Sequence, residues 1–181
     1  MKLLIVYGTT QGQTRKIARH ILDLLFDAGH SGELLPAADA SGLDPTAFDA
    51  VFLASSVHAG HYHRDLVSFV EQHAEGLNAL PSCFVSVSLA AAGHSPDDWR
   101  GLDQIAQDFG YATGWTPSQT LQVAGAYTPS RYDIVTRFVM RRIVAAKDPE
   151  ADLTAHKEYT DWAALDRDVL SWVNAVFTSH A

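Results

Sequence analysis

The sequence predicts an α/β fold in which a parallel sheet is covered by helices on both faces. Short, continuously apolar runs rich in β-branched residues alternate along the chain with longer stretches whose apolar residues repeat at helical spacing. Continuous apolarity is typical of strands that are buried on both sides, as in parallel sheets. Right-handed crossovers through the helices then connect successive strands.

The first half of the chain is predicted to supply three strands and two helices. The run "LLIVY" predicts a strand, and after it Ile17, Ile21 and Leu25 recur on one helical face until Gly29 ends the pattern. The segment "ADASGLDPTAF" reads as a loop with one helical turn. We therefore expect strands at residues 3–7, 31–36 and 50–56, and helices at residues 14–28 and 63–77.

The second half of the chain is predicted to add two strands and three helices. Ser95 is a favourable N-cap, and Pro96 and two acidic residues follow it in the first helical turn. The stretch "KDPEADLTAHKE" reads as a loop before a last helix, which Thr160 or Asp161 caps. We expect strands at residues 82–90 and 120–127, and helices at residues 95–110, 131–146 and 162–176.

Composition and charge limit the classes of protein to consider. The 181 residues suffice for a sizeable core, and we expect a single domain over residues 1–181. The formal net charge of −8 argues against a nucleic-acid partner. Cys83 is the one cysteine, so no internal disulfide can form, and it reads as a buried structural thiol. We expect a cytoplasmic location, because the sequence shows neither a signal peptide nor an apolar run near the ~20 residues of a membrane span.

A loop rich in glycine and hydroxyl groups, "YGTTQGQT", follows the first predicted strand. It is not a Walker A loop, because three residues separate its glycines and Gln13 follows in place of lysine, and it is not a G-x-G-x-x-G motif. Backbone N–H groups and the hydroxyls of Thr9, Thr10 and Thr14 can instead surround one phosphate at a helix N-terminus. An ordinary strand-to-helix turn capped by threonine is the alternative interpretation.

The stretch "TTQGQT" resembles the phosphate loop of flavodoxins, T/S-x-T-G-x-T, with Gln11 in place of a hydroxyl residue. The resemblance implies a flavodoxin-like three-layer sandwich with a five-stranded parallel sheet in the order 2-1-3-4-5, and non-covalent FMN as cofactor. It also implies that the loops after strands three and four hold the isoalloxazine ring. The cofactor-binding residues expected on this basis are Thr9, Thr10, Gln11, Gly12, Gln13, Thr14, Ser55, Ser56, Val57, His58, Ala59, Gly60, Ser88, Leu89, Ala90, Ala91, Ala92 and Gly93.

A narrower resemblance extends over nearly the whole chain. The segments "YGTTQGQTRKIA", "ASSVHAGHYH", "LPSCFVSVSL" and "YTDW" together look like the flavodoxin-type, quinone-dependent protoporphyrinogen dehydrogenases of bacterial haem synthesis. That family implies FMN-dependent oxidation of protoporphyrinogen IX to protoporphyrin IX. A respiratory quinone of the membrane is the implied electron acceptor, and removal of six electrons requires three two-electron cycles.

An arginine-rich segment at about residues 128–158 is an addition to the alternating pattern. It predicts docking, either to an anionic membrane surface at the inner face of the cell membrane or to the propionates of a porphyrin. A packed helix with a solvated basic face is the alternative. The candidate residues for substrate or membrane contact are Tyr62, Arg131, Arg137, Arg141 and Arg142.

The histidines after the third strand do not match a metal site. His58, His61 and His63 lie in one loop without a carboxylate or cysteine to complete a familiar ligand set, and we expect no metal. Flavin contact by His58 or Tyr62, with Gly60 allowing a backbone turn near the ring, is the functional alternative. No residue stands out as a general base.

Two other functions remain open at this point. The negative charge favours a flavodoxin-type electron carrier that docks basic partners, although a small carrier has no need of the arginine-rich segment. An FMN-dependent quinone reductase fed by a nicotinamide cofactor is the third hypothesis. The sequence also allows a homodimer.

Overall fold

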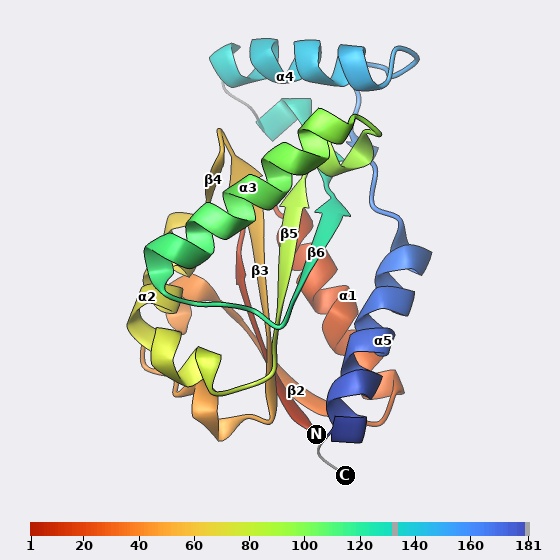
Figure 1. Cartoon of the computed structure of the whole chain (residues 1–181). Coiled ribbons are helices and arrows are strands. Elements are labelled where there is room, and N and C mark those ends of the chain that lie inside the picture. The colour runs from red at the N-terminus through yellow and green to blue at the C-terminus, as the bar shows by residue number, and fades with distance from the viewer. Residues whose placement is uncertain (132–133, 180–181) are drawn as a thin grey trace.

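The computed structural model describes residues 1–131 and 134–179, and within them five parallel strands stand between two layers of helices (Figure 1). Their order is β2-β1-β3-β5-β6, so the predicted order 2-1-3-4-5 is confirmed. Ile5 at the centre of β1 lies beside Leu34 on one side and Phe52 on the other. The bounds of the strands are Lys2–Gly8 for β1, Ser31–Pro36 for β2, Ala50–His58 for β3, Ser82–Ser88 for β5 and Gln119–Ala124 for β6.

The longer helices divide between the two faces of the sheet, with one exception. Helices α1 and α5 cover one face, and α2 and α3 cover the other. The exception is α4, which lies across the carboxyl ends of the strands (Figure 1). The bounds are Gln13–Asp27 for α1, Arg64–Asn78 for α2, Pro96–Thr113 for α3, Ile134–Lys147 for α4 and Trp162–Ser179 for α5. Short 3-10 turns occupy Ala37–Asp39 (η1), Pro45–Ala47 (η2), Ala90–Ala92 (η3) and Pro129–Arg131 (η4).

Alternate residues of each central strand enter two separate cores. In β1, Leu3 and Ile5 pack with α1 and α5, whereas Leu4 and Val6 pack with α2 and α3. All four side chains are fully buried. A strand between two helical layers has no solvent-facing side, which is why its sequence is continuously apolar rather than alternating.

The predicted fifth strand, residues 120–127, breaks at Gly125. The chain leaves the sheet there, and Ala126–Tyr127 (β7) pairs antiparallel with Lys157–Glu158 (β8), which lies in the segment expected to be a loop. A Cβ at Gly125 would lie 3.2 Å from Val87, so the backbone crosses tightly over β5 at this point. The short β7–β8 pair ties the 128–158 segment to the sheet.

Three other boundaries differ from the sequence-based expectation. The strand predicted over residues 82–90 ends at Ser88, after which the chain forms η3. Helix α3 continues past Gly110 to Thr113, because Gly114, at φ 71°, supplies the left-handed C-cap. Strand β3 runs on to His58 and turns back as His61–Tyr62 (β4), a short antiparallel strand.

Candidate functional site

The loop between β1 and α1 has the backbone geometry of known anion sites. Gly12 is the N-cap of α1 with φ 98°, a left-handed conformation that favours glycine, and the helix has no side-chain cap. The Gly12 N–H donates to the Thr9 hydroxyl oxygen at 3.0 Å, which closes the loop on itself. The first N–H groups of α1 have no intrahelical acceptor, as in any α-helix, and they point into the loop. This is the arrangement that binds phosphate at helix N-termini.

Two buried hydroxyl groups at this end of the sheet lack partners within the described part of the chain. Thr14 in α1 is 1% exposed, and its Oγ1 has no hydrogen-bond partner among the described residues. The Oγ of Ser56 in β3 is also buried and has no hydrogen-bond partner among the described residues. Buried hydroxyls are almost always hydrogen-bonded, so two orphans at one site indicate a polar ligand between them. Both residues line one pocket.

The pocket joins the predicted loops at the carboxyl ends of the strands. Ten of the expected cofactor-binding residues line it: Thr9, Gln11, Gln13, Thr14, Ser56, Val57, His58, Ala59, Ser88 and Leu89. Eight expected residues lie nearby but outside the lining: Thr10, Gly12, Ser55, Gly60, Ala90, Ala91, Ala92 and Gly93. The structure adds Val87 of β5 and four residues from later in the chain: Gly125 and Ala126 from the β6–β7 crossing, and Thr136 and Met140 from α4. No local pattern signals these four residues, because their place depends on how the 128–158 segment folds back.

The strand-three loop is a two-residue hairpin turn. His58 pairs with His61 across the turn, and the two residues between them, Ala59 and Gly60, have φ 48° and 79°. Positive φ at both central residues is the hallmark of a type I′ turn. Ala59 is the one non-glycine residue in the described chain with positive φ, and strained backbone of this kind concentrates at functional sites.

His58 lies on the pocket as a neutral base. Desolvation lowers the pKa of its imidazole below the usual 6.5, and the nearby His63 lowers it further. His58 is therefore neutral at pH 7. His63, the N-cap residue of α2, lies against Gly8, where an added Cβ would come within 2.6 Å of the His63 Cβ.

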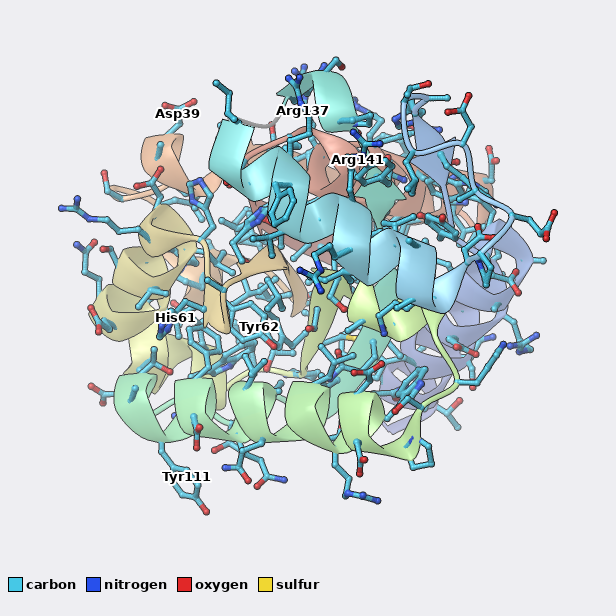
Figure 2. All side chains as sticks on the ribbon, turned by 90° about the horizontal axis from the view of Figure 1, so that it is seen from above. Asp39, His61, Tyr62, Tyr111, Arg137 and Arg141 are labelled. Atoms are coloured by element: carbon cyan, nitrogen blue, oxygen red, sulfur yellow. The ribbon has the colours of Figure 1, made fainter. Side chains whose placement is uncertain are left out.

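Tyr62 has a structural place that differs from its expected role in substrate or membrane contact. Its side chain is 7% exposed, and its ring packs edge-on against Phe84 with centroids 4.8 Å apart. The Tyr62 hydroxyl is 3.0 Å from the Ser86 hydroxyl, and burial raises the pKa of Tyr62 to about 12. In Figure 2, Tyr62 lies between α3 and α4 as seen from above, whereas Arg137 and Arg141 lie on α4 itself. Tyr62 is a core residue because β4 turns it inward over β5.

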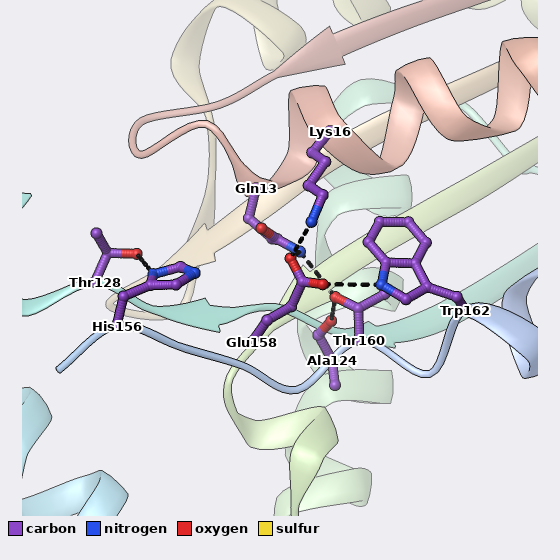
Figure 3. A network of polar contacts seen from close by, with 8 residues as sticks. All are labelled: Gln13, Lys16, Ala124, Thr128, His156, Glu158, Thr160 and Trp162. Carbon is purple, nitrogen blue, oxygen red and sulfur yellow. Dashed lines mark hydrogen bonds and ion pairs between the residues drawn. The ribbon is translucent and has the colours of Figure 1, made fainter. Parts of the chain in front are cut away.

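The 128–158 segment is fastened to the start of α1 by a polar network (Figure 3). Gln13 Nε2 donates to both Glu158 and Thr160 at 3.0 Å, and Lys16 Nζ lies 2.6 Å from the Glu158 carboxylate. The Trp162 indole N–H also donates to Glu158, at 2.8 Å. Burial raises the pKa of Glu158, but these hydrogen bonds outweigh it and hold that pKa below its usual value.

Helix α4 has a basic and apolar outer face. A groove there is lined by the arginines at positions 137, 141 and 142 together with exposed apolar side chains, including Ile134 at 86% and Phe138 at 63% exposure. The far end of α4 is held by an ion pair between Lys147 and Asp98 of α3. Beneath the helix, Val144 and the buried ring of Tyr127 form a small apolar cluster. Arg131 stands apart from this face, because its guanidinium donates to the Gln11 carbonyl in the phosphate loop.

Comparisons with known proteins agree with this geometry. The flavodoxin domain family matches residues 4–154. Protoporphyrinogen IX dehydrogenase [quinone] of Escherichia coli strain K12 is 32% identical over 163 residues, which cover 90% of this chain and 89% of that protein. The chain belongs to the flavodoxin domain family and, within it, to the protoporphyrinogen IX dehydrogenase [quinone] family. The Leishmania major relative of the same name is 30% identical over 174 residues, 92% of this chain and 72% of that protein.

A solved structure shows the shared fold. A short-chain flavodoxin associated with a non-canonical PDU bacterial microcompartment superposes with a TM-score of 0.61 over 97% of this chain and 99% of that one, at 11% identity. The family match and the relatives, rather than this superposition, show that the chain is an oxidoreductase of the flavodoxin type with FMN as its cofactor. The orphaned hydroxyls of Thr14 and Ser56 and the open start of α1 fit that cofactor. Within the described residues, no helix combines the length and apolarity that a bilayer crossing requires.

Proposed function

We propose that this chain oxidises protoporphyrinogen IX to protoporphyrin IX and passes the electrons to a membrane quinone. Relatives from a bacterium and a protozoan carry the name of this activity and align with at least 90% of the chain. When bound, FMN supplies the two-electron chemistry, and three rounds account for the six electrons removed.

The placement of α4 is the observation that carries this proposal. Its inner side brings Thr136 and Met140 onto the pocket, while its outer side carries the arginines and exposed apolar residues. The helix thus links the pocket to a surface suited to a hydrophobic, anionic partner. An electron carrier with an exposed flavin edge does not require a helix such as α4 over the pocket.

The remaining residues bind and position the reactants. The α1 N-terminus and the Thr14 hydroxyl would hold the cofactor phosphate, and His58 and Ala59 of the β3–β4 turn, which line the same pocket, would contact the flavin ring. His58, neutral at pH 7, presents an imidazole that can accept a proton at the pocket wall.

The deciding experiment mixes the FMN-loaded protein anaerobically with protoporphyrinogen IX and a quinone. We expect porphyrin fluorescence to rise well above the rate measured without protein and the rate measured without quinone. Fluorescence at the uncatalysed rate would contradict the proposal. Quinone reduction at the expense of a nicotinamide cofactor would then favour the quinone reductase, and electron transfer to redox proteins alone would favour the carrier.

We also propose that the outer face of α4 docks on the anionic inner face of the cell membrane, where the quinone resides. Each basic residue near such a surface contributes about 1 kcal/mol, so removing two should weaken binding roughly 30-fold. The test is co-sedimentation with vesicles containing anionic lipid, comparing the wild type with Arg141→Gln/Arg142→Gln. The control variant is Arg100→Gln, whose arginine pairs with Asp97 on α3.

Equal binding to neutral and anionic vesicles, or no loss in the double variant, would contradict membrane docking. In that case, loss of porphyrin affinity in the same double variant would assign these arginines to the propionates instead. A homodimer stays a prediction, which sedimentation equilibrium can measure.

A further inference from the structure

The phosphate loop contains no cation of its own. Residues 8–14 include neither lysine nor arginine, yet the phosphate monoester of FMN carries a charge between −1.5 and −2 at pH 7. Helix N-termini and hydroxyl groups supply only partial charges. Any full positive charge at this loop therefore comes from outside residues 8–14.

Arg131 brings such a charge from a distant part of the chain. It is the last residue of η4, a turn fixed by the hydrogen bond from the Arg131 N–H to the Thr128 carbonyl at 3.0 Å. Its guanidinium donates to the carbonyl of Gln11, 120 residues away in sequence. A Cβ at Gly12 would lie 3.1 Å from Nη1, so the guanidinium lies directly against the loop.

The nearest lysine of α1 forms an ion pair with a carboxylate. Lys16 Nζ lies 2.6 Å from Glu158 and 5.1 Å from the centre of the Trp162 ring (Figure 3). Its charge is balanced by that ion pair on the side of α1 that faces β8. Arg131 pairs instead with a neutral carbonyl, and a guanidinium carries five N–H donors in a planar fork that suits phosphate.

We propose that Arg131 binds the 5′-phosphate of FMN, so that the phosphate site is built jointly by the first loop and the 128–158 segment. The guanidinium bridges the Gln11 carbonyl and a phosphate oxygen, and it supplies the full charge that the loop lacks. Cofactor binding then also fixes η4, the turn that precedes α4 in the chain. This inference rests on FMN as cofactor and does not depend on the tetrapyrrole substrate.

The test compares FMN with riboflavin, which lacks the phosphate. The full-length chain, freed of flavin by dialysis, is titrated with each ligand and followed by quenching of flavin fluorescence. Arg131→Gln should weaken FMN binding about 10- to 100-fold and change riboflavin binding less than about twofold. Arg131→Lys should recover part of the loss, because it keeps the charge without the planar fork.

A matched control distinguishes direct contact with the phosphate from a change in the net charge of the protein. Arg100→Gln removes the same charge from an exposed site on α3 and should leave FMN affinity within about twofold of the wild type. Added salt should weaken FMN binding to the wild type more than to Arg131→Gln, a comparison that also stands if Arg131→Gln is less stable. Unchanged FMN affinity in Arg131→Gln would overturn the proposal. Equal losses of affinity for FMN and riboflavin would overturn it too, because they would show that Arg131 maintains the conformation of the loop rather than contacting the phosphate.

Discussion

The Thr14 hydroxyl occupies an unusual position for a buried polar group. It is enclosed at the start of α1 with no acceptor or donor among the described residues, although leaving such a group unpaired costs about 1–3 kcal/mol. The sequence predicts the Thr14 hydroxyl at a phosphate site, with a threonine-capped turn as the alternative, and in the structure Gly12 is the N-cap while Thr14 lines the pocket. A hydrogen bond from this hydroxyl to a bound phosphate oxygen would remove that cost.

Thr14→Val should therefore act in opposite directions on ligand binding and on stability. Loss of a hydrogen bond to a charged phosphate should weaken FMN binding by at least about 1.5 kcal/mol, roughly tenfold in Kd. The flavin-free protein should be as stable as the wild type or more so, since an unpaired hydroxyl is removed. Fluorescence titration and urea unfolding measure the two effects. Thr116→Val, at an exposed position between α3 and β6 and outside the pocket lining, is the control, and an equal loss of affinity there would contradict this role of Thr14.

Gly60 allows a test of backbone strain free of packing effects. Its φ is 79°, and a Cβ added there would meet nothing within 4 Å. Gly60→Ala should lower the free energy of unfolding by about 1 kcal/mol, because an L-residue is strained in the left-handed region. Gly42→Ala has equally open space without positive φ, so it should be neutral or slightly stabilising. Equal urea midpoints for the two variants would contradict this prediction, because the β3–β4 turn would then accommodate the alanine without loss of unfolding free energy.

At the scale of elements, β8 and the start of α1 are joined through one carboxylate. Glu158 accepts from Gln13, Lys16 and Trp162, and these bonds hold the 128–158 segment over the phosphate loop. The segment was expected to be a loop at this point. A two-residue strand carries too little periodicity to be recognised, and it forms here because β7 offers it a partner.

Glu158→Gln should make the unfolding free energy less dependent on pH. The folded pKa of Glu158 lies below its unfolded value of about 4.5, so the unfolded chain binds more protons between these values. The stabilisation is fully present above about pH 4.5 and is lost as the pH falls through the folded pKa. At pH 7 the wild type should exceed Glu158→Gln by about 1 kcal/mol, and the difference should shrink below pH 4. Glu71→Gln, at an exposed position on α2, is the control, and a difference that persists in acid would contradict this account.

At the scale of the whole molecule, the sheet order creates the site. Strands β1, β3 and β5 lie side by side, so the loops that follow them meet at one end of the sheet, as ligand sites do in folds of this class. Helix α4 then closes this end from above, held by Lys147 at one end and by the β7–β8 pair below. A ligand bound here contacts several elements at once.

FMN should therefore stabilise the entire protein against unfolding. At a free concentration of 100 times Kd, binding to the folded state alone raises the free energy of unfolding by about 2.7 kcal/mol. The expected readout is a Tm higher by about 5–10 °C in a thermal melt with excess FMN. Riboflavin at the same concentration should give a smaller shift, and no shift with FMN would contradict the assigned site.

Local pattern was sufficient for most of the architecture. The spacing of Ile17, Ile21 and Leu25 predicts α1, and the continuous apolar run of β1 predicts a strand buried on both faces, as observed. Ten of the expected cofactor-binding residues line the pocket because each lies at the carboxyl end of a strand that the sequence identifies, or in the turn or helix start that follows it. Their roles towards FMN remain predictions. Tyr62 could not be placed in this way, since one hairpin turn decides whether its ring faces solvent or the core.

The sequence by itself determined the alternation of strands and helices and the loop that follows β1, because apolar periodicity and turn residues act over a few neighbouring positions. Only the tertiary structure decided what meets at that loop. Arg131 contacts Gln11 across 120 residues, Glu158 contacts Lys16 across 142, and Met140 lines the pocket from above. Such contacts depend on where the 128–158 segment packs after Gly125 turns it out of the sheet, and no local repeat encodes that path.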